Sequence, residues 1–172
     1  MAGISEVIQT IGAIIIFSLI LLTSNRMILK NSTQEVETEA EGIAITLGQN
    51  IIKEAQTKAF DENTTDQNVP KTVPDGFSGI DSDGENRSNF DDFDDYNGYT
   101  NTMDTKLGAQ SFAVAVKVAY VSPSNNYDIE KGSETVPTNF KMMQVTITSD
   151  YLDNNREIKL SHLRRYFKTK EQ

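Results

Sequence analysis

The sequence predicts an α+β fold, in which a long N-terminal helix packs on a C-terminal antiparallel β-meander of three or more strands. Three observations predict it. An apolar run from Ile4 to Leu22 continues into an amphipathic stretch with helical spacing, and no proline occurs before Pro70. After residue 110 the spacing of apolar residues changes to two, the period of a strand. The stretch between them is rich in Gly and Asp, which excludes a long regular element there.

Residues 1–30, MAGISEVIQTIGAIIIFSLILLTSNRMILK, are predicted to form a helix that is apolar nearly all round. The 19 residues from Ile4 to Leu22 come close to the roughly 20 that cross a bilayer. A cleaved signal peptide fits poorly because no basic residue precedes the run. A plain single-span anchor fits, with Arg26 and Lys30 placing the acidic C-terminal region in the cytoplasm. The third interpretation is a helix that is inserted in membrane before assembly and then packs against copies of itself.

Residues 31–60 favour the third interpretation, because they continue the helix with a single apolar face. The apolar positions recur at steps of three or four: Val36, Ala40, Ile43, Leu47, Ile51, Ala55 and Ala59. The opposite face is mostly charged. The alternative is a separate surface helix that begins after LKNSTQ, where Asn31 or Ser32 can serve as its N-cap.

Residues 61–110 form the predicted loop region, which is acidic and rich in Gly, Asp and aromatic residues. A loop of this length in a compact domain needs side chains that pack it. We expect five aromatic residues to do so: Phe77, Phe90, Phe93, Tyr96 and Tyr99.

Residues 111–172 are predicted to form the antiparallel sheet. In SFAVAVKVAYVS, alternation puts one set of residues on a single face: Phe112, Val114, Val116, Val118 and Tyr120. In NFKMMQVTITS, the inward residues are Met143, Val145 and Ile147. REIKLSHLRRYF supplies a third strand, and its basic end at Arg164 and Arg165 is expected to be solvated. A three-stranded sheet needs a cover, and the amphipathic helix is the expected one.

Composition excludes several classes of function. The net charge of −9 argues against a nucleic-acid partner, because phosphate binding needs clustered Lys and Arg. The chain has no cysteine and a single histidine, His162, which argues against thiolate chemistry, histidine metal sites and a Ser/His catalytic pair. We therefore expect a protein that is not an enzyme and has no cofactor, apart from calcium at the acidic motif described next.

The acidic motif DDFDDYNGY places four carboxylates close together: Asp91, Asp92, Asp94 and Asp95. The nearby DSDGE adds Asp81, Asp83 and Glu85. Hard oxygen ligands at this density can bind calcium, although the EF-hand spacing is absent. The competing interpretation is a solvated acidic loop.

The segment GISEVIQTIGAIIIFSLILL and the order of elements resemble the type IV pilin and pseudopilin family. Family members carry a glutamate a few residues from the processed N-terminus, and Glu6 resembles it: removal of Met1 makes it the fifth residue. The sequence departs from the family in lacking a basic leader that ends in glycine and the helix-kinking proline of many bacterial members. Gly12 and the TSN at 23–25 are the candidates for local unwinding.

The resemblance implies a structural subunit of an extracellular pilus-like filament, a homo-oligomer of identical subunits. Its membrane-anchored precursor is expected in the inner membrane, with a pilus-type assembly machinery as partner. Glu6 is expected to neutralise the N-terminal amine of a neighbouring subunit. The other residues expected in assembly contacts are Ile11, Ile14, Ile15, Phe17 and Leu21. The alternative function is a single-span, membrane-anchored extracytoplasmic binding or sensor domain, with calcium binding as an added role.

Overall fold

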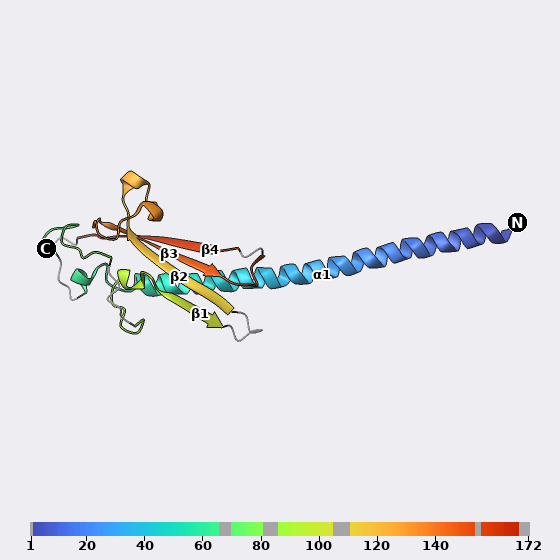
Figure 1. Ribbon diagram of the computed structural model, residues 1–172, viewed down its shortest axis with the longest axis horizontal. Coiled ribbons are helices and arrows are strands. Elements are labelled where there is room, and N and C mark those ends of the chain that lie inside the picture. Colours follow the sequence, from blue (N-terminus) through green and yellow to red (C-terminus); the bar gives the residue numbers. More distant parts are fainter. Residues whose placement is uncertain (1, 66–69, 81–85, 105–110, 154–155, 169–172) are drawn as a thin grey trace. The chain divides into compact units, whose positions relative to one another are not determined.

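The computed structural model describes residues 2–65, 70–80, 86–104, 111–153 and 156–168. The chain divides into two compact units, Met1–Ala40 and Glu41–Gln172. Helix α1 (Ala2–Gln56) begins in the first unit and ends in the second, which also contains all four described strands (Figure 1).

Helix α1 is one uninterrupted helix of 55 residues. It runs through LKNSTQ, so the prediction of a single long helix is confirmed and the alternative of two helices is wrong. Hydroxyl groups within its apolar part bond back to the helix: Ser18 Oγ donates to the Ile14 carbonyl and Thr23 Oγ1 to the Leu19 carbonyl, both at 2.8 Å. These bonds occupy the hydroxyl donors inside the helix, which lowers the cost of placing them in an apolar setting.

The helix ends at Gln56, a few residues before the predicted end at 60. The Thr57 N–H bonds to the Glu54 carbonyl at 3.0 Å, and the Thr57 hydroxyl bonds to the same oxygen at 2.7 Å. The Ala59 N–H then donates to the Asp91 carbonyl at 2.9 Å. The helix ends here because Thr57 bonds three residues back instead of four, and the Ala59 N–H finds its acceptor in the loop region.

The sheet contains β1 (Thr100–Asp104), β2 (Ser111–Tyr120), β3 (Phe140–Thr148) and β4 (Ile158–Arg165), in that order and all antiparallel. The predicted α+β fold with an antiparallel meander is therefore confirmed. The boundary at 110 was wrong, because β1 lies inside the region predicted as loop. Its sequence, TNTMD, has no alternation of large apolar residues, and only Met103 is partly buried. Its pairing with β2 at the sheet edge makes it a strand.

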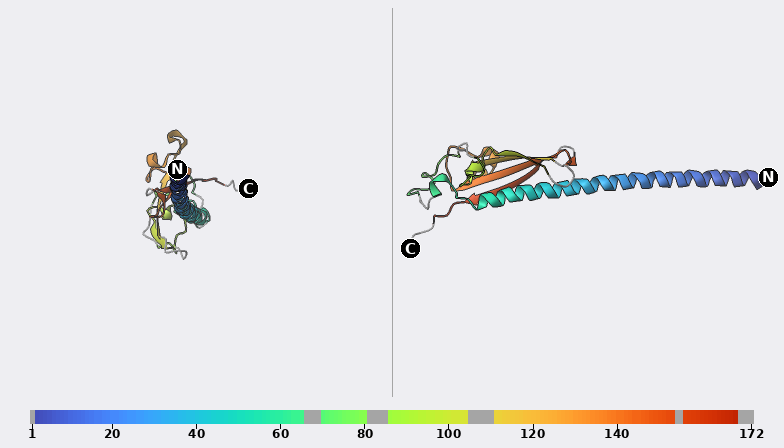
Figure 2. Two further views of the ribbon diagram at one scale, coloured as in Figure 1. Left: turned by 90° about the vertical axis from the view of Figure 1, so that its right-hand side faces the viewer. Right: turned by 90° about the horizontal axis from the view of Figure 1, so that it is seen from below.

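One face of the sheet carries the core of the second unit. The alternating residues of β2 are buried as predicted, and so are Met143, Val145 and Ile147 of β3. The end of α1 lies along this face (Figure 2). A Cβ added to Gly48 would come within 2.9 Å of Ile147 Cδ1 and 2.5 Å of Leu160 Cδ1, so glycine permits the helix to approach the sheet closely.

The inner face becomes polar at one end of the sheet. In the strand register, Tyr120 of β2 lies beside Lys141 of β3, which lies beside Arg164 of β4. The side chain of Lys141 is completely buried. This polar row meets the end of α1 and the residues that follow it.

The aromatic residues of the loop region pack as predicted. Phe77, Phe90, Phe93 and Tyr96 are buried, and Tyr99 is half-buried. Polar contacts add to this packing: Tyr96 Oη donates to Glu54 Oε1 at 2.9 Å, and Arg87 Nη1 donates to Tyr99 Oη at 2.8 Å. Arg87 also forms a two-point ion pair with Glu54, which lowers the Glu54 pKa. These contacts hold the loop region on the last turns of α1.

Candidate functional site

The apolar part of α1 is exposed within its own unit. The helix contains an 18-residue window long and apolar enough to cross a membrane, and none of that window is buried. The exposed large apolar residues run from Ile4 to Leu29: Ile4, Val7, Ile8, Ile11, Ile14, Ile15, Ile16, Phe17, Leu19, Ile20, Leu21, Leu22, Met27, Ile28 and Leu29. An apolar surface of this extent marks an interaction with lipid or with protein.

All five apolar residues predicted for assembly lie on this exposed segment, and Phe17, for example, is 61% exposed. Glu6 is also exposed, and its carbonyl accepts the hydroxyl of Thr10. Glu6 and Phe17 lie on one face of the helix, because 11 residues make about three turns. The nearest basic residue along α1 is Arg26, 20 positions on, which is about 30 Å of helix. No Lys or Arg side chain of this helix segment is therefore close enough to pair with Glu6.

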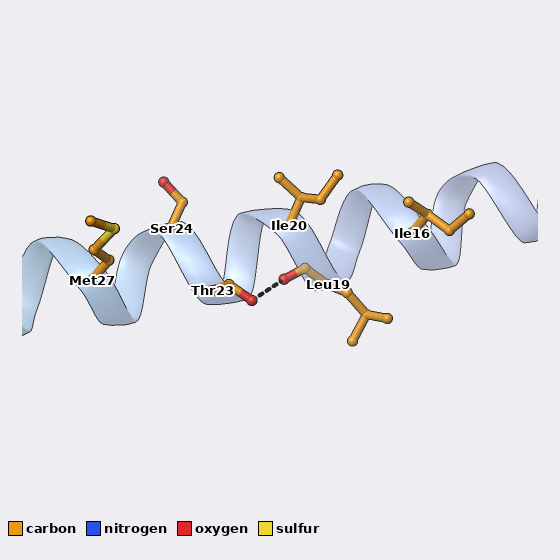
Figure 3. Close-up of a pocket in the computed structure, with 6 residues that line it drawn as sticks. All are labelled: Ile16, Leu19, Ile20, Thr23, Ser24 and Met27. Atoms are coloured by element: carbon orange, nitrogen blue, oxygen red, sulfur yellow. Dashed lines mark hydrogen bonds between the residues drawn. The ribbon is translucent and has the colours of Figure 1, made fainter.

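A shallow groove lies along the same segment. It is lined by Ile16, Leu19, Ile20, Thr23, Ser24 and Met27 (Figure 3). Figure 3 shows the Thr23 hydroxyl turned toward the Leu19 carbonyl, to which it donates. The groove is therefore mostly apolar, with one of its two hydroxyls bonded to the helix.

Two carboxylates of the acidic motif, of Asp92 and Asp95, accept hydrogen bonds from the backbone N–H groups of their own turn. Asp92 Oδ1 accepts the N–H groups of Asp94 and Asp95, at 2.8 and 3.1 Å. Asp95 Oδ2 accepts the N–H groups of Asp91 and Asp92, at 2.7 and 2.9 Å. Asp92, Asp94 and Asp95 are buried and Asp91 is exposed. The expectation of a solvated loop is therefore wrong for DDFDD, where three of the four acidic side chains are buried and two of them, Asp92 and Asp95, hold the backbone of the turn.

Lys141 lies at the centre of a buried charge cluster formed with Asp61, Asp92 and Asp94. Its Nζ donates to the Phe60 carbonyl at 2.8 Å, to Asp61 Oδ2 at 3.0 Å, and to Asp94 Oδ1. Asp61, Asp92 and Asp94 are each at most 2% exposed. Buried charges persist in proteins where they are paired and hydrogen-bonded, and this cluster meets both conditions.

Burial raises the pKa of Asp94 to about 8, although the charge of Lys141 acts in the opposite direction. Burial raises the pKa of Asp92 as well. The nearby charge of Asp92 also raises the pKa of Asp94. Asp92 accepts two N–H groups, which favour its ionised form, whereas a pKa of about 8 favours protonated Asp94 near neutral pH.

Calcium binding at Asp91, Asp92, Asp94 and Asp95 stays a prediction. Within the described ranges, no three His, Cys, Asp or Glu residues are grouped as metal ligands. The Asp94 carboxyl contacts an ammonium group instead. Asp81, Asp83 and Glu85 lie outside the described residues.

The chain matches no known protein-family model, no curated protein and no solved structure.

Arg164 is a residue whose role the sequence analysis missed. Its guanidinium donates to the carbonyls of Ala55, Lys58 and Ala59, at 3.2, 2.6 and 2.9 Å. Its Cζ also lies 5.2 Å from the centre of the Phe93 ring. A cation that satisfies the free carbonyls at a helix C-terminus stabilises that end. Arg164 is therefore a cap for α1, and the expectation that it is a solvated strand end is wrong.

The only histidine offers a test of the packing beside this cap. His162 accepts a hydrogen bond from Gln56 at 3.3 Å, and burial, then the charge of Arg164, lower its pKa below the usual value of 6.5. A lowered folded-state pKa means that the stability His162 contributes is complete above about pH 6.5 and is lost as the pH falls through the folded-state pKa.

The imidazole proton resonances of the folded full-length protein are expected to titrate below pH 6.5. The same resonances in the urea-unfolded chain, which should titrate near 6.5, provide the control. A folded-state midpoint at or above that of the unfolded chain contradicts the burial of this ring.

Proposed function

We propose that the chain is a structural, non-enzymatic subunit of an extracellular type IV pilus-like filament and polymerises through its N-terminal helix. The observation that carries this proposal is the exposed apolar segment of α1 with Glu6 near its start. In the precursor this segment is inserted in the inner membrane. A pilus-type assembly machinery then transfers it to the filament core, where identical helices pack together.

Apolar burial supplies the driving force for this assembly. Burial of apolar surface contributes about 25 cal/mol per Å², so a segment exposed on every side can contact several neighbours favourably. Contacts between different faces of identical subunits do not close on themselves and generate a helical filament. The second unit supports this division of roles, because its sheet already has a buried core and the end of α1 as cover.

Glu6 sets the register between subunits in this proposal. A carboxylate in an apolar setting is costly unless a cation meets it, and the nearest basic residue along α1 is about 30 Å away. The N-terminal amine of a neighbouring subunit is a cation that arrives only on assembly. The pairing therefore favours one axial position of adjacent helices.

The second candidate function is a single-span anchored binding or sensor domain. It is favoured by the length of the apolar window, which suits a membrane span without any polymerisation. In this case Arg26 and Lys30 mark the end of the span.

Replacing Glu6 by alanine tests the register. Loss of one charge pair in an apolar contact costs at least about 1.4 kcal/mol, which raises the protein concentration needed for polymerisation at least about tenfold. Detergent removal from the purified full-length protein, followed by negative-stain electron microscopy over a concentration series, measures this. Glu35→Ala, which removes another exposed glutamate of α1, is the matched control and should polymerise normally.

Two results decide against parts of the proposal. Normal filaments from Glu6→Ala at the wild-type concentration contradict the role of Glu6. Monodisperse detergent-bound particles from the wild-type protein, without filaments, support the anchored domain instead.

A further inference from the structure

Lys141 combines features that allow an amine to act as a nucleophile in the protein interior. Its side chain is 0% exposed, and its Nζ lies 4.9 Å from the ring centres of both Phe60 and Tyr120. Two carboxyl groups, of Asp61 and Asp94, lie in hydrogen-bond contact with the same nitrogen. The site is closed to solvent. It brings together an amine (Lys141), a carboxyl carbon that it can attack (Asp94) and a second carboxylate (Asp61).

We propose that Lys141 and Asp94 condense to form an intramolecular isopeptide bond, with Asp61 as the general base. The bond joins β3 to the short helical turn at Asp94–Tyr96. This proposal concerns the second unit alone and does not rest on filament formation.

The two carboxyl groups differ in their partners, which assigns their roles. Asp61 accepts four donors: the N–H groups of Asn63 and Ser78, the Tyr120 hydroxyl and Lys141 Nζ. A carboxyl group with four donors is an ionised acceptor and can take a proton from the ammonium. Asp94 instead has a pKa raised by burial to about 8, which favours its protonated form near neutral pH. A protonated carboxyl group is the form that an amine attacks, because its leaving group is water.

The reaction balances without any further reagent. Asp61 Oδ2, 3.0 Å from Nζ, takes one proton from the ammonium and leaves a neutral amine. The amine lone pair then attacks Cγ of protonated Asp94 and forms the N–C bond. The tetrahedral adduct loses a second proton from nitrogen to the departing hydroxyl group, the C–O bond breaks, and water leaves. The products are the amide, one water and a protonated Asp61, so the total charge of the three groups is zero before and after.

The mass of the purified full-length protein tests the proposal directly. The wild-type chain is expected to be one water lighter than Lys141→Arg after allowance for that substitution. Lys141→Arg is the matched control because the guanidinium keeps the positive charge at this position and is not a nucleophile. A wild-type protein with the full mass of its sequence overturns the proposal.

Peptide mapping locates the bond. Trypsin does not cleave after an acylated lysine, so the linked form yields segment 88–106 joined to segment 132–156 with Lys141 uncleaved. Cleavage after Lys141 in the wild-type protein overturns the proposal. A link from Lys141 to segment 59–71 places the bond on Asp61 and overturns the assignment of Asp94.

Two variants test the assigned roles. Asp94→Asn is expected to release ammonia instead of water, so its linked product has the same mass as the linked wild-type protein; Asp94→Ala is expected to remain unlinked. Asp61→Asn retains a similar shape and is expected to fold but to lose most of the link, with folding checked by circular dichroism. Equal linkage in folded Asp61→Asn contradicts its role as base.

Discussion

Replacement of Lys141 by methionine is expected to lower the free energy of unfolding by about 3–5 kcal/mol, because it leaves the buried Asp61 carboxylate without its cation and the buried Asp94 carboxyl group without a donor. Methionine keeps the length of the side chain, so the loss reports the charge and its bonds more than a cavity. Asp61 and Asp94 both lose a partner, since Lys141 Nζ donates to each of them. If Lys141 and Asp94 are covalently linked, the Lys141→Met variant also loses this cross-link. The loss of stability is then larger, because a cross-link stabilises the fold.

Thermal and urea unfolding of the detergent-solubilised full-length protein, followed by circular dichroism, measures this effect. Lys117→Met is the matched control. Lys117 pairs with Glu130 at 2.8 Å, but the two side chains are 43% and 68% exposed, so its loss should cost less than about 1 kcal/mol. Equal losses at the two positions contradict the importance of the buried cluster.

Replacement of Arg164 by methionine is expected to cost about 2–4 kcal/mol, which makes it the second largest effect. Three carbonyls at and after the end of α1 lose a charged donor, and hydrogen bonds to charged groups contribute about 1.5–3 kcal/mol each without being additive. The last turn of α1 should then fray. Amide hydrogen exchange of residues 51–59 should rise more than exchange in β2.

Arg165→Met is the control for this change. Arg165 is the next residue of β4, is exposed, and stacks on Phe140 and Phe167 at 5.4 and 4.6 Å. It removes the same charge from the same strand but no contact with α1. If Arg165→Met and Arg164→Met destabilise the protein equally, Arg164 is not the cap inferred from these distances.

Local patterns predicted the elements whose side chains repeat. The alternation from Phe112 to Tyr120 assigned β2 and its buried face, because a strand with one buried face must alternate. The three- and four-residue steps from Val36 to Ala55 assigned the amphipathic half of α1 for the corresponding reason. These assignments depend only on neighbours along the chain.

Features that depend on distant partners could not be predicted in this way. β1 is a strand through its pairing with β2, and TNTMD alone carries no strand pattern. Alternation does place Lys141 on the inner face, two residues before Met143, but its carboxylate partners are 80 and 47 residues away in the sequence. Arg164 likewise shares a face with Leu160, while the carbonyls it binds lie more than 100 residues earlier.

The candidate assembly site was located by composition, because an apolar run of this length can be recognised without tertiary contacts. The binding partner of this site could not be predicted from composition, because its identity depends on other molecules. The role of Glu6 therefore stays a prediction until assembly is measured.

The attachment of the end of α1 has a mechanical consequence. Arg164 binds three carbonyls there, Arg87 pairs with Glu54, and Ala59 pairs with Asp91. Tension applied along the helix axis would load these bonds and the helix–sheet packing together, in shear, instead of breaking them one after another. A subunit pulled by its helix should therefore resist extraction of the helix from its sheet until several contacts fail at once.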